Sequence, residues 1–300
     1  MPPFFVLASI YESLENRGKY SFLHNLKNSS NLELVEADLL KKGSFDLAVQ
    51  DCEGVFHVAS PFHFKYQDPQ KDLIDPAVNG TLNVLEACSK ESSVRRVVLT
   101  SSAAAIYGAP LSQSETFDES NWNTKSTIET SPYPLSKVLA EKAAWEFCEK
   151  QQRLFDLIVI NPPLIIGPVL KPKSEEDLNT SSEMILKYLN GSNKTVANGG
   201  IGFVDVRDVA KAHILAMETP QAKGRYICAF GSFTWKHFCE TLRKLFPGYP
   251  IATEGGNDVA PYFKTDKIRK ELAMEFIPIE QTLKDLVESL VQNGWIEKKD

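Results

Sequence analysis

Short apolar runs alternate with amphipathic stretches through the first two thirds of the chain. Four runs have the length of a strand and end in an acid or in small residues: 32–39, 54–60, 95–102 and 154–163. Helical patterns lie between them, over residues 44–50, 76–90 and 133–151. Apolar strands separated by helices are typical of a parallel sheet that is covered on both faces. The pattern predicts an α/β fold with a doubly wound, Rossmann-like parallel sheet.

The pattern changes after Pro168. A polar segment at 171–183 leads into a helix, and a strand and helix follow at 202–219. Near the end of the chain, Leu283, Leu286 and Leu290 share one face of a predicted helix. We therefore expect a dinucleotide-binding domain and a smaller, discontinuous substrate-binding region. Their predicted boundaries are 1–165 with 201–219 returning to it, and 166–200 together with 220–300.

Composition and charge exclude several kinds of partner. The net charge of −6 disfavours binding to nucleic acid or to an anionic membrane, since either would need a basic face. No stretch approaches the ~20 apolar residues of a transmembrane helix, and the first ten residues lack the basic leader of a signal peptide. The five cysteines are scattered without a CxxC pair, and the histidines do not cluster with them at ligand spacing, which favours reduced thiols and no metal site. We expect a cytoplasmic protein that acts on a small molecule.

The helix that opens near residue 131 carries the clearest candidate chemistry. Pro132 suits the first helical position, and Tyr133 and Lys137 follow it four residues apart, on one face. A nearby ammonium group lowers the pKa of a phenol from its usual value of about 10. Such a pair suits carbonyl reduction or alcohol oxidation, although a Tyr-x-x-x-Lys spacing also arises by chance. One predicted strand ends at Ser101 and Ser102, so a serine hydroxyl can meet the phenol at the sheet edge where ligands bind.

Many ordered motifs resemble one known family. The chain is similar to the extended short-chain dehydrogenase/reductases of the NAD-dependent epimerase/dehydratase superfamily, in the branch of dihydroflavonol and cinnamoyl-CoA reductases. The resemblance runs from about residue 13 to the C-terminus. The matching stretches are ADLLKKGSFDLAV, CEGVFHVASP, DPAVNGTLNVLEAC, RRVVLTSSAAAIYG, SPYPLSKVLAEKAAWEF, NPPLIIGP, GFVDVRDVAKAHILAMETPQAKGRYIC and PIEQTLKDLVESL.

The resemblance implies an oxidoreductase that uses NADP(H), or NAD(H), to reduce a ketone or aldehyde to an alcohol. Tyr133 would be the proton donor, Lys137 would lower its pKa and bond the nicotinamide ribose, and Ser102 rather than Ser101 would polarise the carbonyl. Other cofactor positions are implied for Ser101, for Asp38 and Leu39 beside the adenine, for Val58, Ala59 and Ser60 along the cofactor backbone, and for Pro162, Pro163 and Leu164 near the nicotinamide amide.

One family feature does not occur in this sequence. The family begins with a strand and a GxxGxxG turn, whose amides bind the pyrophosphate, but the first glycine here is Gly18 and no such motif follows. We therefore expect an N-terminally truncated sheet, in which residues 3–11 are the second family strand or occupy the place of the first. Losing about three amide–phosphate bonds of roughly 1.5–3 kcal/mol each would weaken cofactor binding by about three orders of magnitude or more.

Other functions stay open on these observations. A cofactor-impaired pseudoenzyme or binding protein, or a truncated gene model, would explain the missing turn. Hydroxysteroid dehydrogenases and nucleotide-sugar epimerases share the Tyr/Lys pair, whereas GVFHVASP and GRYIC favour the reductase branch. A homodimer is compatible with the fold, but no residue specifies it. The substrate would be selected by the loops around 103–128 and 164–200.

Overall fold

A computed structural model describes residues 21–60, 66–151, 155–170 and 178–299. The chain divides into two compact units, which we describe separately. The first consists of residues up to Gly108, Trp122–Asn161 and His213–Tyr226, and the second of Ala109–Asn121, Pro162–Ala212 and Ile227–Asp300. The division differs from the predicted boundaries at several segments: 109–121, 162–165 and 201–212 belong to the second unit, and 220–226 belong to the first. One strand of 109–121 pairs inside the second unit, and residues 224–226 belong to the sheet of the first.

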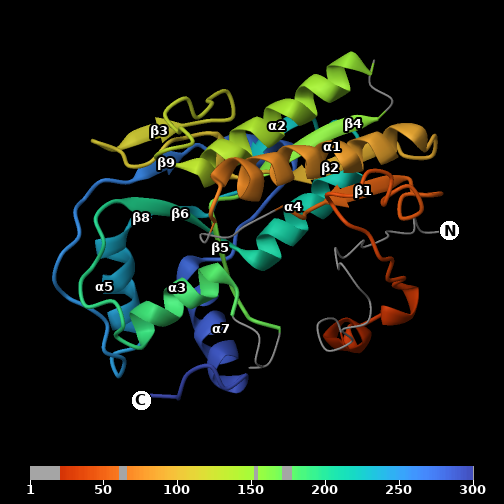
Figure 1. Cartoon of the computed structure of the whole chain (residues 1–300). Helices are drawn as coiled ribbons and strands as arrows, with labels where there is room; N and C mark the ends of the chain where they lie inside the picture. Colours follow the sequence, from red (N-terminus) through yellow and green to blue (C-terminus); the bar gives the residue numbers. More distant parts are fainter. Residues whose placement is uncertain (1–20, 61–65, 152–154, 171–177, 300) are drawn as a thin grey trace. The chain divides into compact units, whose positions relative to one another are not determined.

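A four-stranded sheet forms the centre of the first unit (Figure 1). Its strands, in spatial order, are β1 (Gly54–His57), β2 (Arg96–Thr100), β4 (Asp156–Asn161) and β7 (Gly224–Ile227). β2 is parallel to both β1 and β4, and Leu99 lies opposite His57 on one side and Val159 on the other. The carboxyl ends of these three strands therefore lie at the same edge of the sheet. This confirms the predicted Rossmann-like α/β fold with its parallel sheet.

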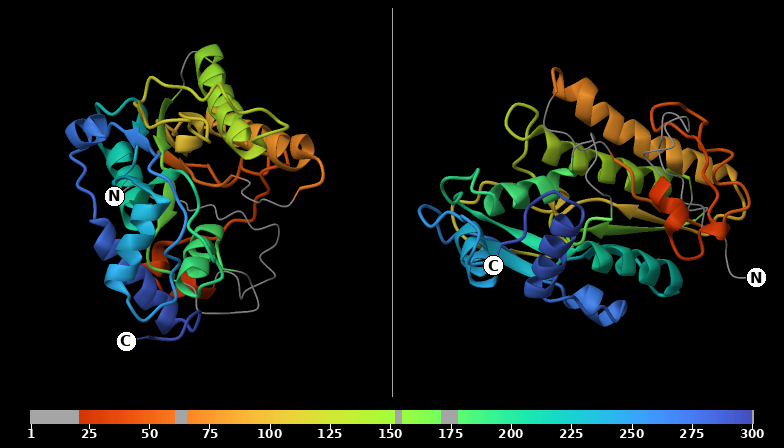
Figure 2. Two further views of the ribbon diagram at one scale, coloured as in Figure 1. Left: turned by 90° about the vertical axis from the view of Figure 1, so that its left-hand side faces the viewer. Right: turned by 90° about the horizontal axis from the view of Figure 1, so that it is seen from below.

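Two long helices lie side by side over one face of this sheet (Figures 1 and 2). They are α1 (Asp75–Lys90), which continues a π-helical turn η4 (Gln70–Ile74), and α2 (Pro132–Lys150). The core beneath them is made of buried apolar side chains that include Val84, Leu85, Val97, Ala144 and Val159. Burial of this shared apolar face is what holds both helices against the sheet.

The end of α4 (Val206–Glu218) packs against the strands of this unit. A Cβ on Gly54 would lie 2.5 Å from the Met217 sulfur, so a larger residue here would displace the flexible end of the Met217 side chain. Buried Arg96 donates to four carbonyl oxygens at and just beyond the helix end: Ala216 at 2.9 Å, Met217 at 3.2 Å, Thr219 at 2.6 Å and Pro220 at 3.1 Å. Arg96 thus donates hydrogen bonds to carbonyls that a helix end leaves without partners. Its positive charge also interacts favourably with the negative end of the helix dipole.

Two predicted elements are wrong. Residues 32–38 form neither a strand nor a helix. No described segment pairs with them, and a strand needs a partner for its backbone groups. Residues 44–50 form successive turns in place of the predicted helix. Short 3-10 helices occur at η2 (Ser21–Asn25), η3 (Ser29–Asn31) and η5 (Ala103–Ala105). The segment 3–11, on which the predicted truncation depends, lies outside the described residues.

The second unit contains two small sheets and most of the remaining helices. One sheet has the order β5 (Leu164–Ile166), β6 (Gly200–Asp205) and β8 (Gly231–Thr234), and the other pairs β3 (Glu115–Phe117) with β9 (Pro261–Phe263). The helices wholly within this unit are α3 (Thr180–Leu189), α5 (Trp235–Leu245), α6 (Asp266–Glu271) and α7 (Ile279–Gln292).

Aromatic stacking and the last helix build the core of this second unit. Phe203 and Phe238 stack with ring centroids 4.8 Å apart, and Leu283, Leu286 and Leu290 of α7 are buried, as the spacing predicted. Across the ranges that the structure describes, no helix has both the length and the apolar character needed to cross a membrane.

Candidate active site

The carboxyl edge of the first unit's sheet positions two serine hydroxyls. The amide of Ser101 donates to the Ile160 carbonyl at 2.8 Å, which continues the alignment of β2 with β4. Ser102 follows in extended conformation, and its hydroxyl accepts from the Ala104 amide at 3.1 Å as the N-cap of η5. The strand therefore ends in a short turn that fixes the Ser102 side chain at this edge of the sheet.

The first turn of α2 brings the phenol to this edge. Pro132 starts the helix, where a residue without an amide proton loses no hydrogen bond. The side chains of Tyr133 and Ser102 are hydrogen-bonded to each other, and Lys137 Nζ lies 5.5 Å from the centroid of the Tyr133 ring. The structure thus brings together the three residues predicted to be catalytic. Their chemical roles stay predictions.

Burial acts on both titratable groups of this pair. It raises the pKa of Tyr133 to about 12, while the hydrogen bond with Ser102 acts in the opposite direction. It lowers the pKa of Lys137 to about 8. Both shifts arise because a buried site disfavours the charged form. Burial is thus the dominant cause of the Tyr133 shift, and the lowering of the phenol pKa by Lys137 stays a prediction.

Lys137 is a buried cation without a counter-charge. It is 7% exposed, and among the residues that the structure describes no carboxylate forms an ion pair with it. Nearby His57 ends β1, and burial together with the charge of Lys137 lowers its pKa to about 4. The buried Nε2 of His57 has no hydrogen-bond partner. One buried nitrogen thus lacks a hydrogen-bond partner, and a buried ammonium beside it pairs with no described carboxylate, which fits a ligand rich in hydroxyl groups, such as the ribose of a nucleotide.

The loop after β1 lies at the same edge of the sheet. Val58 is 56% exposed, and Ala59 and Ser60 are half-buried. This arrangement is compatible with the predicted contact along the cofactor backbone, which stays a prediction.

The predicted adenine pair is held in a turn against α1. One Asp38 carboxylate oxygen accepts from the Leu40 amide at 2.8 Å. Leu39 is buried in the core, its carbonyl accepts from Asn83 Nδ2 at 2.7 Å, and its side chain lies against Gly80. Leu39 thus packs inside the protein, and Asp38 is the more accessible of the two.

The remaining predicted cofactor residues have different surroundings. Ser101 is buried, and its hydroxyl donates to Glu141 at 2.6 Å. Pro162, Pro163 and Leu164 follow β4 directly in the chain and begin the second of the three segments that make up the second unit. The structure brings Ser101 beside the catalytic candidates but gives its hydroxyl another partner.

Sequence reasoning missed a buried polar cluster behind these residues. We call it the Glu141 cluster, and it consists of Ser101, Glu141, Trp145, Asn161 and Arg225. One signal was available, because Glu141 follows Lys137 by four residues and so shares its helix face.

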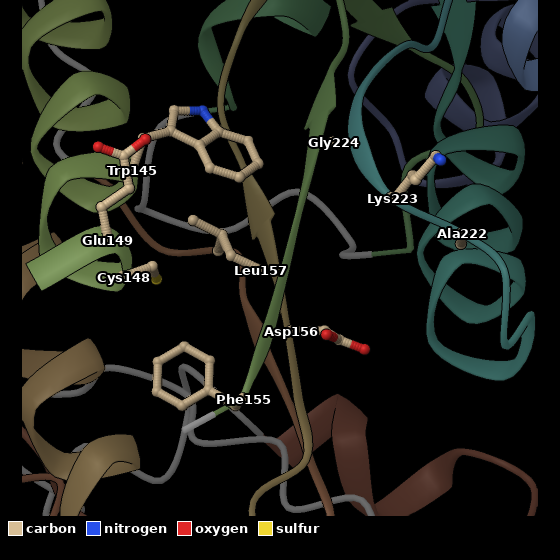
Figure 3. Close-up of a pocket in the computed structure, with 9 residues that line it drawn as sticks. All are labelled: Trp145, Cys148, Glu149, Phe155, Asp156, Leu157, Ala222, Lys223 and Gly224. Carbon is tan, nitrogen blue, oxygen red and sulfur yellow. The ribbon is translucent and has the colours of Figure 1, made fainter. Parts of the chain in front are cut away.

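A cavity of about 260 Å³ lies at the opposite end of β4 (Figure 3). Phe155, Asp156 and Leu157 line it at the start of the strand, together with Trp145 and Lys223. Asn161 ends the same strand, and five residues of strand span about 17 Å. The cavity is therefore separate from the candidate catalytic residues, and none of the predicted site residues lines it.

Known proteins share both the sequence and the fold of this chain. It is 42% identical over 268 residues to the cinnamoyl-CoA reductase CAD2 of Medicago truncatula, which covers 86% of this chain and 79% of that protein. The structure of the yeast methylglyoxal/isovaleraldehyde reductase Gre2 complexed with NADPH matches with a TM-score of 0.84 and 31% identity, over 95% of this chain and 91% of that one. Vestitone reductase from alfalfa (Medicago sativa L.) matches with a TM-score of 0.77 and 29% identity, over 92% of this chain and 88% of that chain.

These relatives confirm the resemblance that the ordered motifs indicated. Residues 8–229 match the NAD dependent epimerase/dehydratase family. The match covers most of the chain and includes the strand ends, the helix α2 and the candidate catalytic residues. This chain belongs to the NAD dependent epimerase/dehydratase family.

Proposed function

We propose that this chain is an NADPH-dependent reductase that converts an aldehyde or ketone into the alcohol. The observation that carries the proposal is the meeting of Ser102, Tyr133 and Lys137 at the carboxyl edge of the sheet. The relatives support it, because one is a cinnamoyl-CoA reductase and another is a reductase in complex with NADPH.

The Ser102–Tyr133 hydrogen bond marks where a substrate oxygen would bind. A carbonyl oxygen placed between the two hydroxyls would accept a hydrogen bond from each, which polarises the carbonyl as negative charge develops on its oxygen. With a pKa of about 12, Tyr133 holds its proton throughout the neutral range and can donate it to that oxygen. NADPH, when bound, supplies the hydride that the carbonyl carbon receives.

Lys137 would stabilise the phenolate that remains after the proton leaves Tyr133. Its pKa of about 8 keeps it mostly protonated at pH 7, and its charge lies 5.5 Å from the ring. Its ammonium group, which pairs with no described carboxylate, would also bind the ribose hydroxyls of the nicotinamide nucleotide. Val58, Ala59 and Ser60 would lie along the cofactor, and Asp38 would lie beside the adenine.

Two experiments test the proposal. The first follows NADPH oxidation with a panel of aldehydes and ketones, for the natural chain and for Tyr133→Phe. Loss of the proton donor should lower kcat by about 10²–10⁴-fold, whereas Tyr262→Phe, at a half-exposed position in β9, should not change it. The second is calorimetry with NADPH. Binding without turnover of any substrate would favour a binding protein over a reductase.

We also infer a cytoplasmic location and keep the homodimer as a prediction. The cysteines support the location, because all five are buried thiols and none forms a disulfide. Sedimentation of the purified chain would give the oligomeric state.

A further inference from the structure

Glu141 lies on the same face of α2 as the candidate catalytic pair. It follows Lys137 by four residues and Tyr133 by eight, so it stands about 6 Å and 12 Å further along the helix axis. Its side chain is fully buried. A shift of Glu141 along this axis would carry Tyr133 and Lys137 with it, because a helix moves as a rigid rod over two turns.

The Glu141 carboxylate accepts hydrogen bonds from every other member of its cluster. One oxygen, Oε2, accepts from Ser101 Oγ at 2.6 Å, Asn161 Nδ2 at 2.9 Å and Arg225 Nη2 at 3.3 Å. The other, Oε1, accepts from Arg225 Nε at 2.6 Å and Trp145 Nε1 at 3.3 Å. A carboxylate offers about four lone-pair positions, so both oxygens are fully used.

The donors come from the ends of different strands. Ser101 follows β2, Asn161 ends β4, and Arg225 lies in β7. The cluster therefore ties one point of α2 to three of the four strands of the sheet. Only Trp145 belongs to α2 itself, and Figure 3 shows its indole projecting from the helix beside β4.

The same cluster also reaches Ser102. Ser101 precedes it in the chain, and Asn161 Nδ2 donates to the Ser102 carbonyl at 3.1 Å as well as to Glu141. The Glu141 carboxylate is thus linked to both residues of the Ser102–Tyr133 hydrogen bond. It is linked to Ser102 through Asn161, and to Tyr133 because both residues belong to α2.

Stability alone does not account for such an arrangement. Arg225 and Glu141 form a buried ion pair, and the Trp122 ring lies 3.9 Å from the Arg225 guanidinium carbon. A buried ion pair is often no more stabilising than apolar side chains of the same volume. Directional bonds from three strands do fix the position of a helix more narrowly than apolar contacts can.

We propose that Glu141 is a positioning residue, which sets the place of α2 against the ends of β2 and β4 and so holds Tyr133 within hydrogen-bond reach of Ser102. The inference rests on the proposed reductase function for its kinetic consequence. Its structural consequence, the environment of the Tyr133 ring, does not depend on activity.

Glu141→Gln is the sharpest variant, because it keeps the shape of the side chain. A carboxamide has one acceptor oxygen and an NH₂ group that only donates. Whichever way it turns, the NH₂ faces an N–H of Arg225, Nε on one side or Nη2 on the other, and a guanidinium group can only donate. The matched control is Glu146→Gln, on the same helix, whose exposed carboxylate contacts Lys150 at 3.6 Å.

The experiment measures the ring of Tyr133 and the kinetics in the same full-length proteins. Tyrosine labelled at ¹³Cζ gives one signal per residue, and Tyr133→Phe identifies the signal of Tyr133. In Glu141→Gln we expect this signal to move, kcat to fall at least about tenfold and KM to stay within about threefold, because a displaced donor weakens the transition state more than substrate binding. Glu146→Gln should change none of these.

Two outcomes would overturn the proposal. One is a folded Glu141→Gln protein, as judged by circular dichroism, whose Tyr133 signal and kcat match those of the control. The second outcome applies if Glu141→Gln does not fold. Ser101→Ala then serves in its place, because it removes only the 2.6 Å hydrogen bond to Glu141. A Tyr133 signal that does not move in Ser101→Ala would overturn the proposal. If the natural chain reduces no substrate, the reductase function fails, and the ring signal still decides whether Glu141 positions α2.

Discussion

Two buried charges stand one turn apart on α2, and their surroundings are opposite. Glu141 receives hydrogen bonds from four side chains and pairs with Arg225. Lys137 is buried without a carboxylate beside it among the described residues, and burial lowers its pKa to about 8. The difference indicates a division of roles. The saturated charge holds the helix in place, and the unsaturated charge is available to a ligand.

Desolvation explains why the two sites should respond differently to mutation. Burying a charge is costly unless polar partners replace the lost water. Removing a hydrogen-bond partner of Glu141 leaves its buried charge uncompensated and should destabilise the protein. Removing Lys137 takes away a buried charge together with its desolvation cost. Stability and activity should therefore change together at the Glu141 cluster and in opposite directions at Lys137.

The largest loss of stability is expected for Arg225→Met. The substitution leaves Glu141 buried without its counter-charge, which should lower the free energy of unfolding by about 3–5 kcal/mol. Urea denaturation measures this, with Arg95→Met as the control because Arg95 is exposed. The control should stay within about 0.5 kcal/mol of the natural chain.

The double variant Glu141→Met/Arg225→Met sharpens this result. With both charges of this pair gone, neither partner is left buried without its counter-charge, so the double variant should be more stable than Arg225→Met alone. Equal losses in both proteins would mean that the ion pair is not what the Arg225 substitution disrupts, and the interpretation of Glu141 as a saturated charge would be wrong.

Lys137→Met should stabilise the protein while it removes activity. The folded-state pKa of about 8 lies below the ordinary 10.5, so below pH 8 the folded state carries an unfavourable buried charge. At about 1.4 kcal/mol per pKa unit, the gain on removing this charge is on the order of 3 kcal/mol at pH 7. Between pH 8 and 10.5 the unfolded chain holds a proton that the folded protein has lost, so the natural chain becomes relatively more stable as the pH rises.

The pH dependence is the decisive measurement for Lys137. The stability difference between Lys137→Met and the natural chain should be constant below about pH 8 and should shrink toward pH 10.5. Lys150→Met, at an exposed position near the end of the same helix, should show no such dependence. A Lys137→Met protein less stable than the natural chain at pH 7 would contradict the view of Lys137 as an unsatisfied charge.

The sequence predicted the elements whose pattern is local. β1, β2, β4, α1 and α2 follow from apolar runs and helical spacing, and Tyr133 and Lys137 follow from their spacing within ordered motifs. The strand predicted at 32–39 was wrong, because a strand depends on a neighbour that its own residues do not specify. The helix predicted at 44–50 forms successive turns instead.

The Glu141 cluster could not be predicted for a related reason. Its members are spread from Ser101 to Arg225, and an acid on a helix has the same sequence pattern whether it is buried or exposed. Only the fold brings these residues together. No sequence pattern indicated that the Ser101 hydroxyl donates to Glu141, and the predicted contact of Ser101 with the cofactor stays a prediction.

Trp145→Phe should have the smallest effect and so tests how the cluster shares its bonds. The indole donates one of the two longest bonds to Glu141, at 3.3 Å, and Oε1 keeps the 2.6 Å bond from Arg225. Losing one hydrogen bond while the ring remains should cost about 0.5–1.5 kcal/mol, with kcat within about twofold of the natural chain. A loss as large as that of Arg225→Met would show that the bonds act as a unit, in which case the position of α2 depends on all of them and not chiefly on those from the strand ends.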